Sequence, residues 1–226
     1  MRIFLDPGHG GRDPGANVKI KESQYTLIYA LELGRALKEL GFDIAYSRTT
    51  DSDVSLSERC AMANRWRADY FISIHFNSGG GVGIETYAFS TGGQGEKLAN
   101  AVQVALITAT DSRDRGRKFS NFQVLRDTSM PAILIEGGFV DSDIDSQKIP
   151  TEDYKRKYIQ GATKGICKAT GVAWKDPYAV APVVADNATV PDKDIYLSVR
   201  VLRSKSDAVM KQIIAMGYAC KVLPLA

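Results

Sequence analysis

The chain opens with the sixteen residues MRIFLDPGHGGRDPGA (Met1–Ala16). A short apolar run stops at an Asp-Pro-Gly turn, and His9, one of only two histidines in the protein, follows it. Such a run predicts a strand that is buried on both faces of a sheet. The loop after the histidine is rich in glycine, so another molecule can approach its backbone closely. We therefore expect a strand that places a histidine at its carboxyl end, beside a loop that leaves room for a substrate.

The composition is that of an ordinary globular protein of 226 residues, with 44% hydrophobic and 24% charged residues. This length suits one domain and a small appendage. The net charge of +3 gives no reason to expect a nucleic-acid partner, which usually requires a clustered basic face. No stretch approaches the ~20 apolar residues that span a membrane, and the first residues do not form a signal peptide. We expect synthesis in the cytoplasm without a classical export signal.

Segments typical of strands and of helices alternate along the chain. Helices are predicted at about residues 23–40, 55–68, 95–110 and 152–170, and strands at 3–5, 42–47, 69–74, 83–89, 123–126 and 131–135. The arginine-rich residues 111–121 are interpreted as a loop. This alternation favours an α/β fold with a mostly parallel twisted sheet of about six strands and helices on both faces.

The second histidine has the same placement as the first. An apolar run over residues 69–74 ends in His75, and glycines follow at 79–81. A third apolar run ends in Glu136, while Glu22 begins the helix after the first strand. The carboxyl ends of parallel strands meet at one edge of the sheet, where ligands bind in such folds. The topology can therefore bring the two histidines and the two glutamates together.

These residue types suggest a metal site. Two histidines and a carboxylate, with a fourth position open to water, are typical of catalytic zinc sites. The candidate ligands are His9, Glu22 and His75, and Glu136 is the candidate base that takes a proton from the water. The alternative is that each histidine is a hydrogen-bonded structural residue at a strand end. A carboxylate that ends an apolar strand favours the site, because burying it without a partner or a cleft is costly.

Four motifs resemble those of the zinc-dependent N-acetylmuramoyl-L-alanine amidases of type 3, which cleave peptidoglycan. They are IFLDPGHGG (residues 3–11), Glu22, SIHFN (73–77) and IEGGF (135–139), and the resemblance spans residues 1–171. It implies one zinc ion on His9, Glu22 and His75, with Glu136 as the catalytic carboxylate. Further likenesses to the family are Arg48, residues 57–59 and residues 125–126, whereas Phe76 and Gly137 depart from its usual pattern.

The resemblance implies hydrolysis of the amide between the lactyl group of N-acetylmuramic acid and L-alanine. Zinc would polarise the carbonyl, while Glu136 would deprotonate the attacking water and return the proton to the leaving amine. Asn77 and Arg126 are secondary candidates for contacts with substrate. Residues 113–117 would either guide an anionic part of the substrate or form a solvated loop, and Asp6 would either orient His9 or cap the turn.

The biological setting has several interpretations. The first is a phage or prophage endolysin, and the second is a host amidase that lyses the sporulation mother cell; the lack of an export signal favours both over a secreted autolysin. Either enzyme would act on the cell wall after its release from the cytoplasm. The remaining alternatives are a zinc peptidase that acts on wall peptides and a wall-binding protein without activity.

The composition changes after about residue 172. Residues 173–193 contain three prolines and no regular period, which predicts a linker. Residues 194–226 are predicted to form a small β-α-β unit, which resembles half of a sporulation-related peptidoglycan-binding repeat. The chain would thus consist of a catalytic domain at 1–172, the linker and this unit. A unit of this size cannot bury a stable core alone, so we expect it to bind the wall or to form a homodimer.

Overall fold

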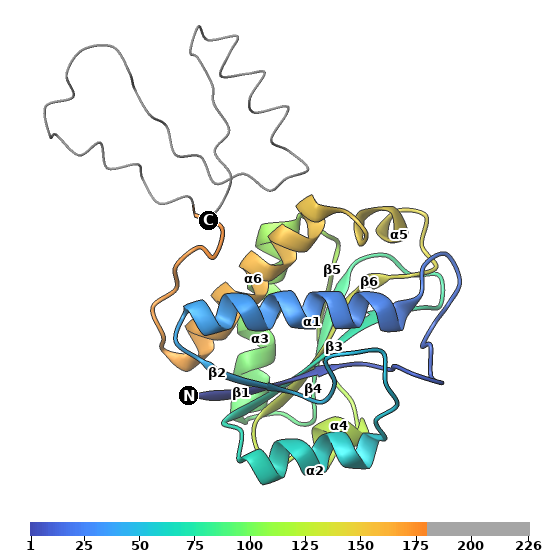
Figure 1. Cartoon of the computed structure of the whole chain (residues 1–226). Helices are drawn as coiled ribbons and strands as arrows, with labels where there is room; N and C mark the ends of the chain where they lie inside the picture. The colour runs from blue at the N-terminus through green and yellow to red at the C-terminus, as the bar shows by residue number, and fades with distance from the viewer. Residues whose placement is uncertain (180–226) are drawn as a thin grey trace, which may run out of the picture. The chain divides into compact units, whose positions relative to one another are not determined.

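The computed structural model describes residues 1–179 (Figure 1). The chain divides into two units, Met1–Ala179 and Val180–Ala226. The predicted β-α-β unit and the homodimer proposed through it lie outside the described residues, as does most of the predicted linker. None of the helices in residues 1–179 is long and apolar enough to cross a membrane.

A six-stranded sheet forms the centre of the first unit, in the order β2-β1-β3-β6-β4-β5. The strands are β1 (Arg2–Pro7), β2 (Asp43–Tyr46), β3 (Tyr70–Asn77), β4 (Ile84–Ala88), β5 (Asp114–Phe119) and β6 (Ala132–Phe139). Neighbouring strands are parallel, except that β4 runs antiparallel to β6. The connection from β3 to β4 is too short for the crossover that a parallel strand needs, so β4 reverses direction. The predicted mostly parallel α/β sheet is confirmed.

Helices cover both faces of this sheet (Figure 1). The long ones are α1 (Glu22–Glu39), α2 (Leu56–Trp66), α3 (Gln94–Thr110) and α6 (Glu152–Thr170), and the short ones are α4 (Gln123–Arg126) and α5 (Asp145–Lys148). Alternate residues of the central strands point to opposite sides. Ile3 and Leu5 belong to the larger core cluster, which includes residues of α1, α3 and α6, whereas Phe4 packs in the cluster with residues of α2 and α4. The apolar runs therefore bury both faces, as predicted.

Two predictions of secondary structure were wrong. Residues 111–121 contain strand β5 instead of being a loop, and residues 123–126 form the helical turn α4 instead of a strand. Strand β5 lies at the edge of the sheet, where charged residues are common and no apolar alternation is required. In α4, the adjacent buried residues Val124 and Leu125 fit either structure, because four residues are too few to reveal a period.

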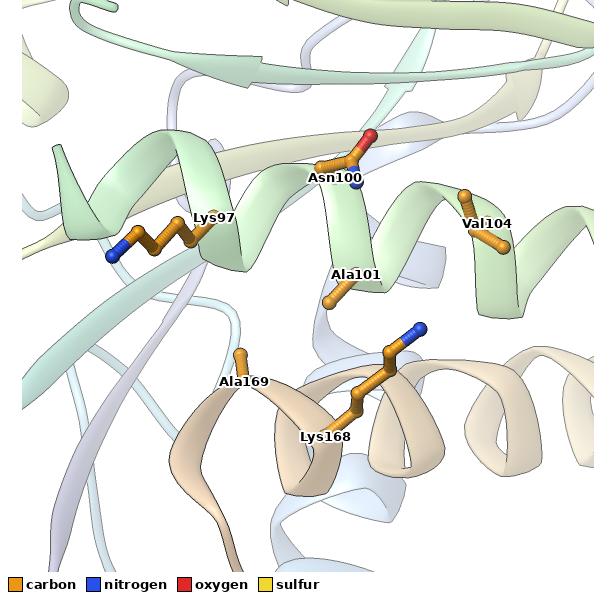
Figure 2. A pocket seen from close by; sticks show the side chains of 6 residues that line it. All are labelled: Lys97, Asn100, Ala101, Val104, Lys168 and Ala169. Carbon is orange, nitrogen blue, oxygen red and sulfur yellow. The ribbon is translucent and has the colours of Figure 1, made fainter. Parts of the chain in front are cut away.

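Helices α3 and α6 pack very closely. A Cβ atom at Gly165 of α6 would lie only 2.5 Å from the Cα atom of Val102 in α3. A groove of about 270 Å³ lies along these helices. Figure 2 shows the side chains that line it, Lys97, Asn100, Ala101, Val104, Lys168 and Ala169. Its lining contains no histidine and no carboxylate, so this groove does not carry the acid–base or metal chemistry predicted from the sequence.

Candidate active site

The predicted site residues meet at one edge of the sheet. His75 lies in β3 and is paired in register with Glu136 of the adjacent strand β6. His9 follows β1, the strand on the other side of β3, and Glu22 is the first residue of α1. The ends of three neighbouring strands and the start of one helix thus bring the four side chains together.

One oxygen atom of Glu22 lies between the two histidines. Its Oε1 atom is 3.0 Å from Nε2 of His9 and 3.0 Å from Nδ1 of His75. The three residues offer ligand atoms that all lie within 4.8 Å of one another. Because all three donors converge on one point, the group could hold a metal ion.

The carboxylate of Glu22 is fixed by the backbone around it. Its Oε2 atom accepts a hydrogen bond from the backbone N–H of Ala16 at 2.9 Å, and its Oε1 atom accepts one from that of Phe76 at 3.1 Å. Burial alone would raise the pKa of Glu22, but the hydrogen bonds and charges of His75 and His9 outweigh it and hold the pKa well below its usual range. Glu22 is therefore an anion, the form in which a carboxylate binds a metal.

His9 is oriented by Asp13, which the sequence analysis missed. Nδ1 of His9 lies 2.8 Å from Oδ2 of Asp13, and Oδ1 of Asp13 accepts a hydrogen bond from the N–H of Gly15 at 3.0 Å. Burial lowers the pKa of His9, but hydrogen bonds and charge from Glu22 and Asp13 raise it above its usual value. With Nδ1 engaged in this way, the Nε2 atom of His9 faces Glu22.

Asp6 takes neither of the roles predicted for it. It is 1% exposed, and its Oδ1 atom accepts hydrogen bonds from Ser47 at 2.6 Å and from Arg59 at 2.7 Å. Its Oδ2 atom accepts a hydrogen bond from Ser73 at 2.8 Å. Asp6 therefore joins β1 to β3 and α2, and it does not contact the imidazole of His9.

Two arginines hold the turn that carries His9. Arg48 donates from Nη2 to the carbonyl oxygens of Gly8 and Ser23, both at 2.8 Å. Arg59 donates from Nη2 to the carbonyl oxygen of His9 at 2.8 Å. His9 itself has a left-handed backbone with φ of 59°, a conformation that is uncommon for a residue other than glycine. The two buried guanidinium groups stabilise this turn because they donate hydrogen bonds to backbone carbonyl groups that would otherwise lack partners.

The glycines beside His9 make room for the ligand side chains. A Cβ atom at Gly8 would lie 2.2 Å from the imidazole of His75. At Gly15, where φ is 64°, a Cβ atom would lie 2.6 Å from both Oε2 of Glu22 and the ring of His9. At these two positions, contact within the protein explains the glycine, and the approach of a substrate to the loop after His9 stays a prediction.

Glu136 has a different environment from Glu22. Its Oε2 atom is buried and has no hydrogen-bond partner among the described residues. Burial raises the pKa of Glu136 to about 7, and the negative charges of Glu22 and Glu85 add to this effect against the opposing charges of His75 and His9. A carboxyl group with such a pKa can both accept and donate a proton near neutral pH.

A cavity of about 550 Å³ opens in front of these groups. Its lining includes His9, His75 and Glu136. Residues at or just before the starts of α2 and α4, and one residue of β6, also line it: Val54, Ser55, Leu56, Phe122, Gln123, Val124 and Leu134. This volume is in the usual range for small-molecule sites. The histidines and Glu136 can therefore reach a substrate that enters from solvent.

The two secondary candidates, Asn77 and Arg126, are not part of the lining of this cavity. Asn77 donates a hydrogen bond from Nδ2 to Oε1 of Glu85 at 2.8 Å. Arg126 interacts with Asp127 at 2.8 Å and with Asn121 at 3.0 Å. Contact of Asn77 or Arg126 with the substrate stays a prediction.

Known proteins with a similar sequence and structure are cell-wall amidases. The Amidase_3 family model, described as N-acetylmuramoyl-L-alanine amidase, matches residues 3–168. The sporulation-specific N-acetylmuramoyl-L-alanine amidase of Bacillus subtilis is 42% identical over 173 residues, which are 75% of this chain and 68% of that protein. The endolysin of Bacillus phage SPP1 is 34% identical over 176 residues, 74% of this chain and 65% of the endolysin. The crystal structure of an N-acetylmuramoyl-L-alanine amidase from Clostridium difficile 630 superposes with a TM-score of 0.73 at 37% identity, over 75% of this chain and 96% of that one.

Proposed function

The chain belongs to the Amidase_3 family of N-acetylmuramoyl-L-alanine amidases, and from this premise we propose roles for its site residues: His9, Glu22 and His75 hold one zinc ion, and Glu136 is the catalytic carboxylate. The family reaction is hydrolysis of the amide bond between N-acetylmuramic acid and L-alanine, and peptidoglycan is the substrate of this enzyme. The observation that carries the proposal is the convergence of two histidine nitrogens on one oxygen of Glu22.

The donor set fits zinc in type and in spacing. Two imidazoles and one carboxylate are a common ligand set for catalytic zinc, and donors bound at 2.0–2.1 Å in a tetrahedron lie roughly 3.3 Å apart. The nitrogen–oxygen distances of 3.0 Å are close to that value. Bound there, a zinc ion supplies a Lewis acid that polarises the carbonyl and lowers the pKa of a water molecule.

Glu136 would move the proton. Its Oε2 atom, which has no hydrogen-bond partner in the described part of the chain, accepts the proton of the attacking water, and the same carboxyl group then donates it to the departing amine of L-alanine. In the metal-free protein its pKa is about 7, which suits a group that accepts and donates a proton near neutral pH. Asp13 would keep Nε2 of His9 directed at the metal throughout.

The test is mass spectrometry of peptidoglycan digested by the purified protein with and without a metal chelator. The proposal predicts free stem peptides that begin with an unblocked L-alanine, and no such peptides in the chelated sample until zinc is restored. Cleavage within the peptides would indicate a peptidase instead, and full activity in the presence of the chelator would contradict the metal site.

The setting of the reaction is a separate proposal. Relatives of both kinds occur, a sporulation amidase and a phage endolysin, and they support both interpretations: an endolysin, or a mother-cell lytic amidase, that reaches the wall after release from the cytoplasm. Deleting the gene and scoring the release of phage and of mature spores separates the two.

We also keep the proposal that residues 194–226, which lie outside the described residues, bind the wall or form a homodimer. Comparing the full chain with a chain truncated after residue 179 tests both roles. Co-sedimentation with purified walls should decrease on truncation if the segment binds them, and a fall in molar mass from dimer to monomer should accompany truncation if it dimerises.

A further inference from the structure

A second buried glutamate lies beside the catalytic carboxylate. Glu85 of β4 is 2% exposed and is paired in register with Glu136 of β6 in the antiparallel part of the sheet. Residues directly opposite each other in an antiparallel pair place their side chains on the same face, about 5 Å apart at Cβ. Glu85 is therefore an immediate neighbour of Glu136.

Polar side chains saturate the carboxylate of Glu85. Its Oε2 atom accepts from Nε of Arg115 at 2.7 Å and from Nζ of Lys118 at 2.5 Å, both on β5. Its Oε1 atom accepts from Nδ2 of Asn77 at 2.8 Å and from the hydroxyl of Tyr87 at 2.7 Å. Two cations thus share one carboxylate, and neither makes another ion pair within residues 1–179. Glu85, Tyr87, Arg115 and Lys118, which we call the Glu85 cluster, thus carry two positive charges and one negative charge.

Arg115 retains free donors in this cluster. Among the described residues, only its Nε atom has a hydrogen-bond partner, so both terminal nitrogens remain available. The guanidinium group lies over the ring of Phe139, 4.7 Å from its centroid, and its side chain is 28% exposed. Glu85 and Phe139 therefore hold Arg115 in one orientation, with two N–H groups free for a carboxylate.

The residues of the cluster do not line the cavity themselves, but two residues that do line it adjoin the cluster. Glu136 lines the cavity and is the register partner of Glu85. Phe122 also lines the cavity, and it packs edge-on against Tyr87 with ring centroids 5.1 Å apart. The hydroxyl of Tyr87 in turn donates to Glu85.

The order of the strands gives the cluster a place in the reaction. The histidines lie on the β1 and β3 side of Glu136, and the cluster lies on the β4 and β5 side. In the proposed function the carbonyl faces the histidines, and Glu136 returns a proton to the leaving amine. The peptide attached to that amine then extends toward β4 and β5.

We propose that Arg115 and Lys118, held by Glu85, form a subsite for a carboxylate of the stem peptide on the leaving side of the scissile amide. Arg115 is the specificity-determining residue, because its fixed guanidinium can bind a carboxylate with two parallel hydrogen bonds. The subsite rests on the proposed role of Glu136 for its orientation. A purely structural role of the cluster, in attaching the edge strand β5 to β4, would give no preference between charged and neutral peptides.

The experiment changes the substrate before it changes the protein. Two synthetic muropeptides are compared that differ only in a carboxylate or a carboxamide on the residue after L-alanine. The wild-type enzyme should hydrolyse the carboxylate form with a kcat/KM roughly 10- to 100-fold higher, mostly through KM, as expected for a charge-assisted pair. In Arg115→Gln the preference should fall to about twofold, because the variant loses the lower KM for the carboxylate form.

Arg113→Gln is the matched control, because Arg113 is an exposed arginine just before β5 and forms no ion pair in the described part of the chain. It should keep the wild-type preference. Equal kcat/KM values for the two substrates in the wild type, or an unchanged preference in Arg115→Gln, would overturn the subsite.

Calorimetric binding of the free stem peptide separates this inference from the proposed function. Binding needs no turnover, so carboxylate-dependent affinity that is lost in Arg115→Gln would support the subsite even if neither muropeptide were hydrolysed. Hydrolysis of both muropeptides, with peptide binding that ignores the carboxylate, would refute the subsite and leave the amidase mechanism intact.

Discussion

Two glutamates at the same edge of the sheet have opposite properties. Glu22 accepts hydrogen bonds from the backbone, and the hydrogen bonds and charges of the two histidines outweigh its burial and hold its pKa well below the usual range. Glu136 is buried, and its Oε2 atom has no hydrogen-bond partner within residues 1–179; burial raises its pKa to about 7. The comparison teaches that the environment decides which carboxylate is a permanent anion for a metal and which exchanges protons.

The largest effect is expected from a substitution of Glu22, the proposed metal ligand of the two glutamates. Glu22→Gln removes the negative charge that both histidines face, so we expect zinc binding to weaken by about 10³-fold or more and activity to disappear with it. Zinc content after gel filtration and a competitive chelator titration measure this directly. The exposed Glu39→Gln is the control, and stoichiometric zinc in Glu22→Gln would contradict the assignment of Glu22 as a ligand.

The raised pKa of Glu136 predicts that the stability of the protein depends on pH. In the metal-free protein, the folded pKa of Glu136 is about 7 against 4.5 for the ordinary group. The folded state therefore holds this proton more tightly, and the resulting stability is complete below about pH 4.5 and is lost as the pH rises through 7. At pH 8 the metal-free Glu136→Gln variant should be more stable than the wild type, by up to about 3 kcal/mol.

Chemical denaturation at pH 4 and at pH 8 measures this difference in the free energy of unfolding. Most of the gain should disappear at pH 4, where both proteins carry a neutral group at position 136. A wild type that is as stable as the variant at pH 8 would show that Glu136 is not penalised by burial.

A smaller effect is expected at Asp13. Asp13→Ala frees Nδ1 of His9, and loss of such an orienting partner typically weakens metal affinity by about 10- to 100-fold. Asp53→Asn is the matched control, since Asp53 binds the same loop at the N–H and side chain of Arg12 without touching His9. If both substitutions weakened zinc binding equally, Asp13 would stabilise the loop without a specific role at His9.

The sequence predicted the residues at the strand ends better than it predicted the hydrogen-bond partners around them. Apolar runs followed by a polar residue identified His9, His75 and Glu136, because strand ends in parallel sheets share one edge. The role of Asp13 as the partner of His9, which the sequence analysis gave to Asp6 as one alternative, could not be predicted in the same way. It depends on the left-handed backbone at His9, which turns the loop back on itself and brings Asp13 to the ring.

Strand β5, on the opposite side of Glu136 from the histidines, was also poorly predicted, for a physical reason. Strand β5 carries no apolar pattern, and its cations are stabilised by Glu85 of β4 and, for Arg117, by Glu96 of α3. Such pairs join residues far apart in the sequence and leave no local signal. The arginine-rich stretch was therefore interpreted as a loop, although its charges hold an edge strand beside the active site.

The most direct test of the central claim is to measure zinc content and peptidoglycan hydrolysis on the same preparation of Glu136→Gln. We predict one zinc ion per chain and an unchanged chelator titration, with a rate at least about 10²- to 10⁴-fold below that of the wild type. Loss of zinc would mean that Glu136 contributes to metal binding. Hydrolysis at the wild-type rate with zinc in place would contradict its role as the group that moves the proton.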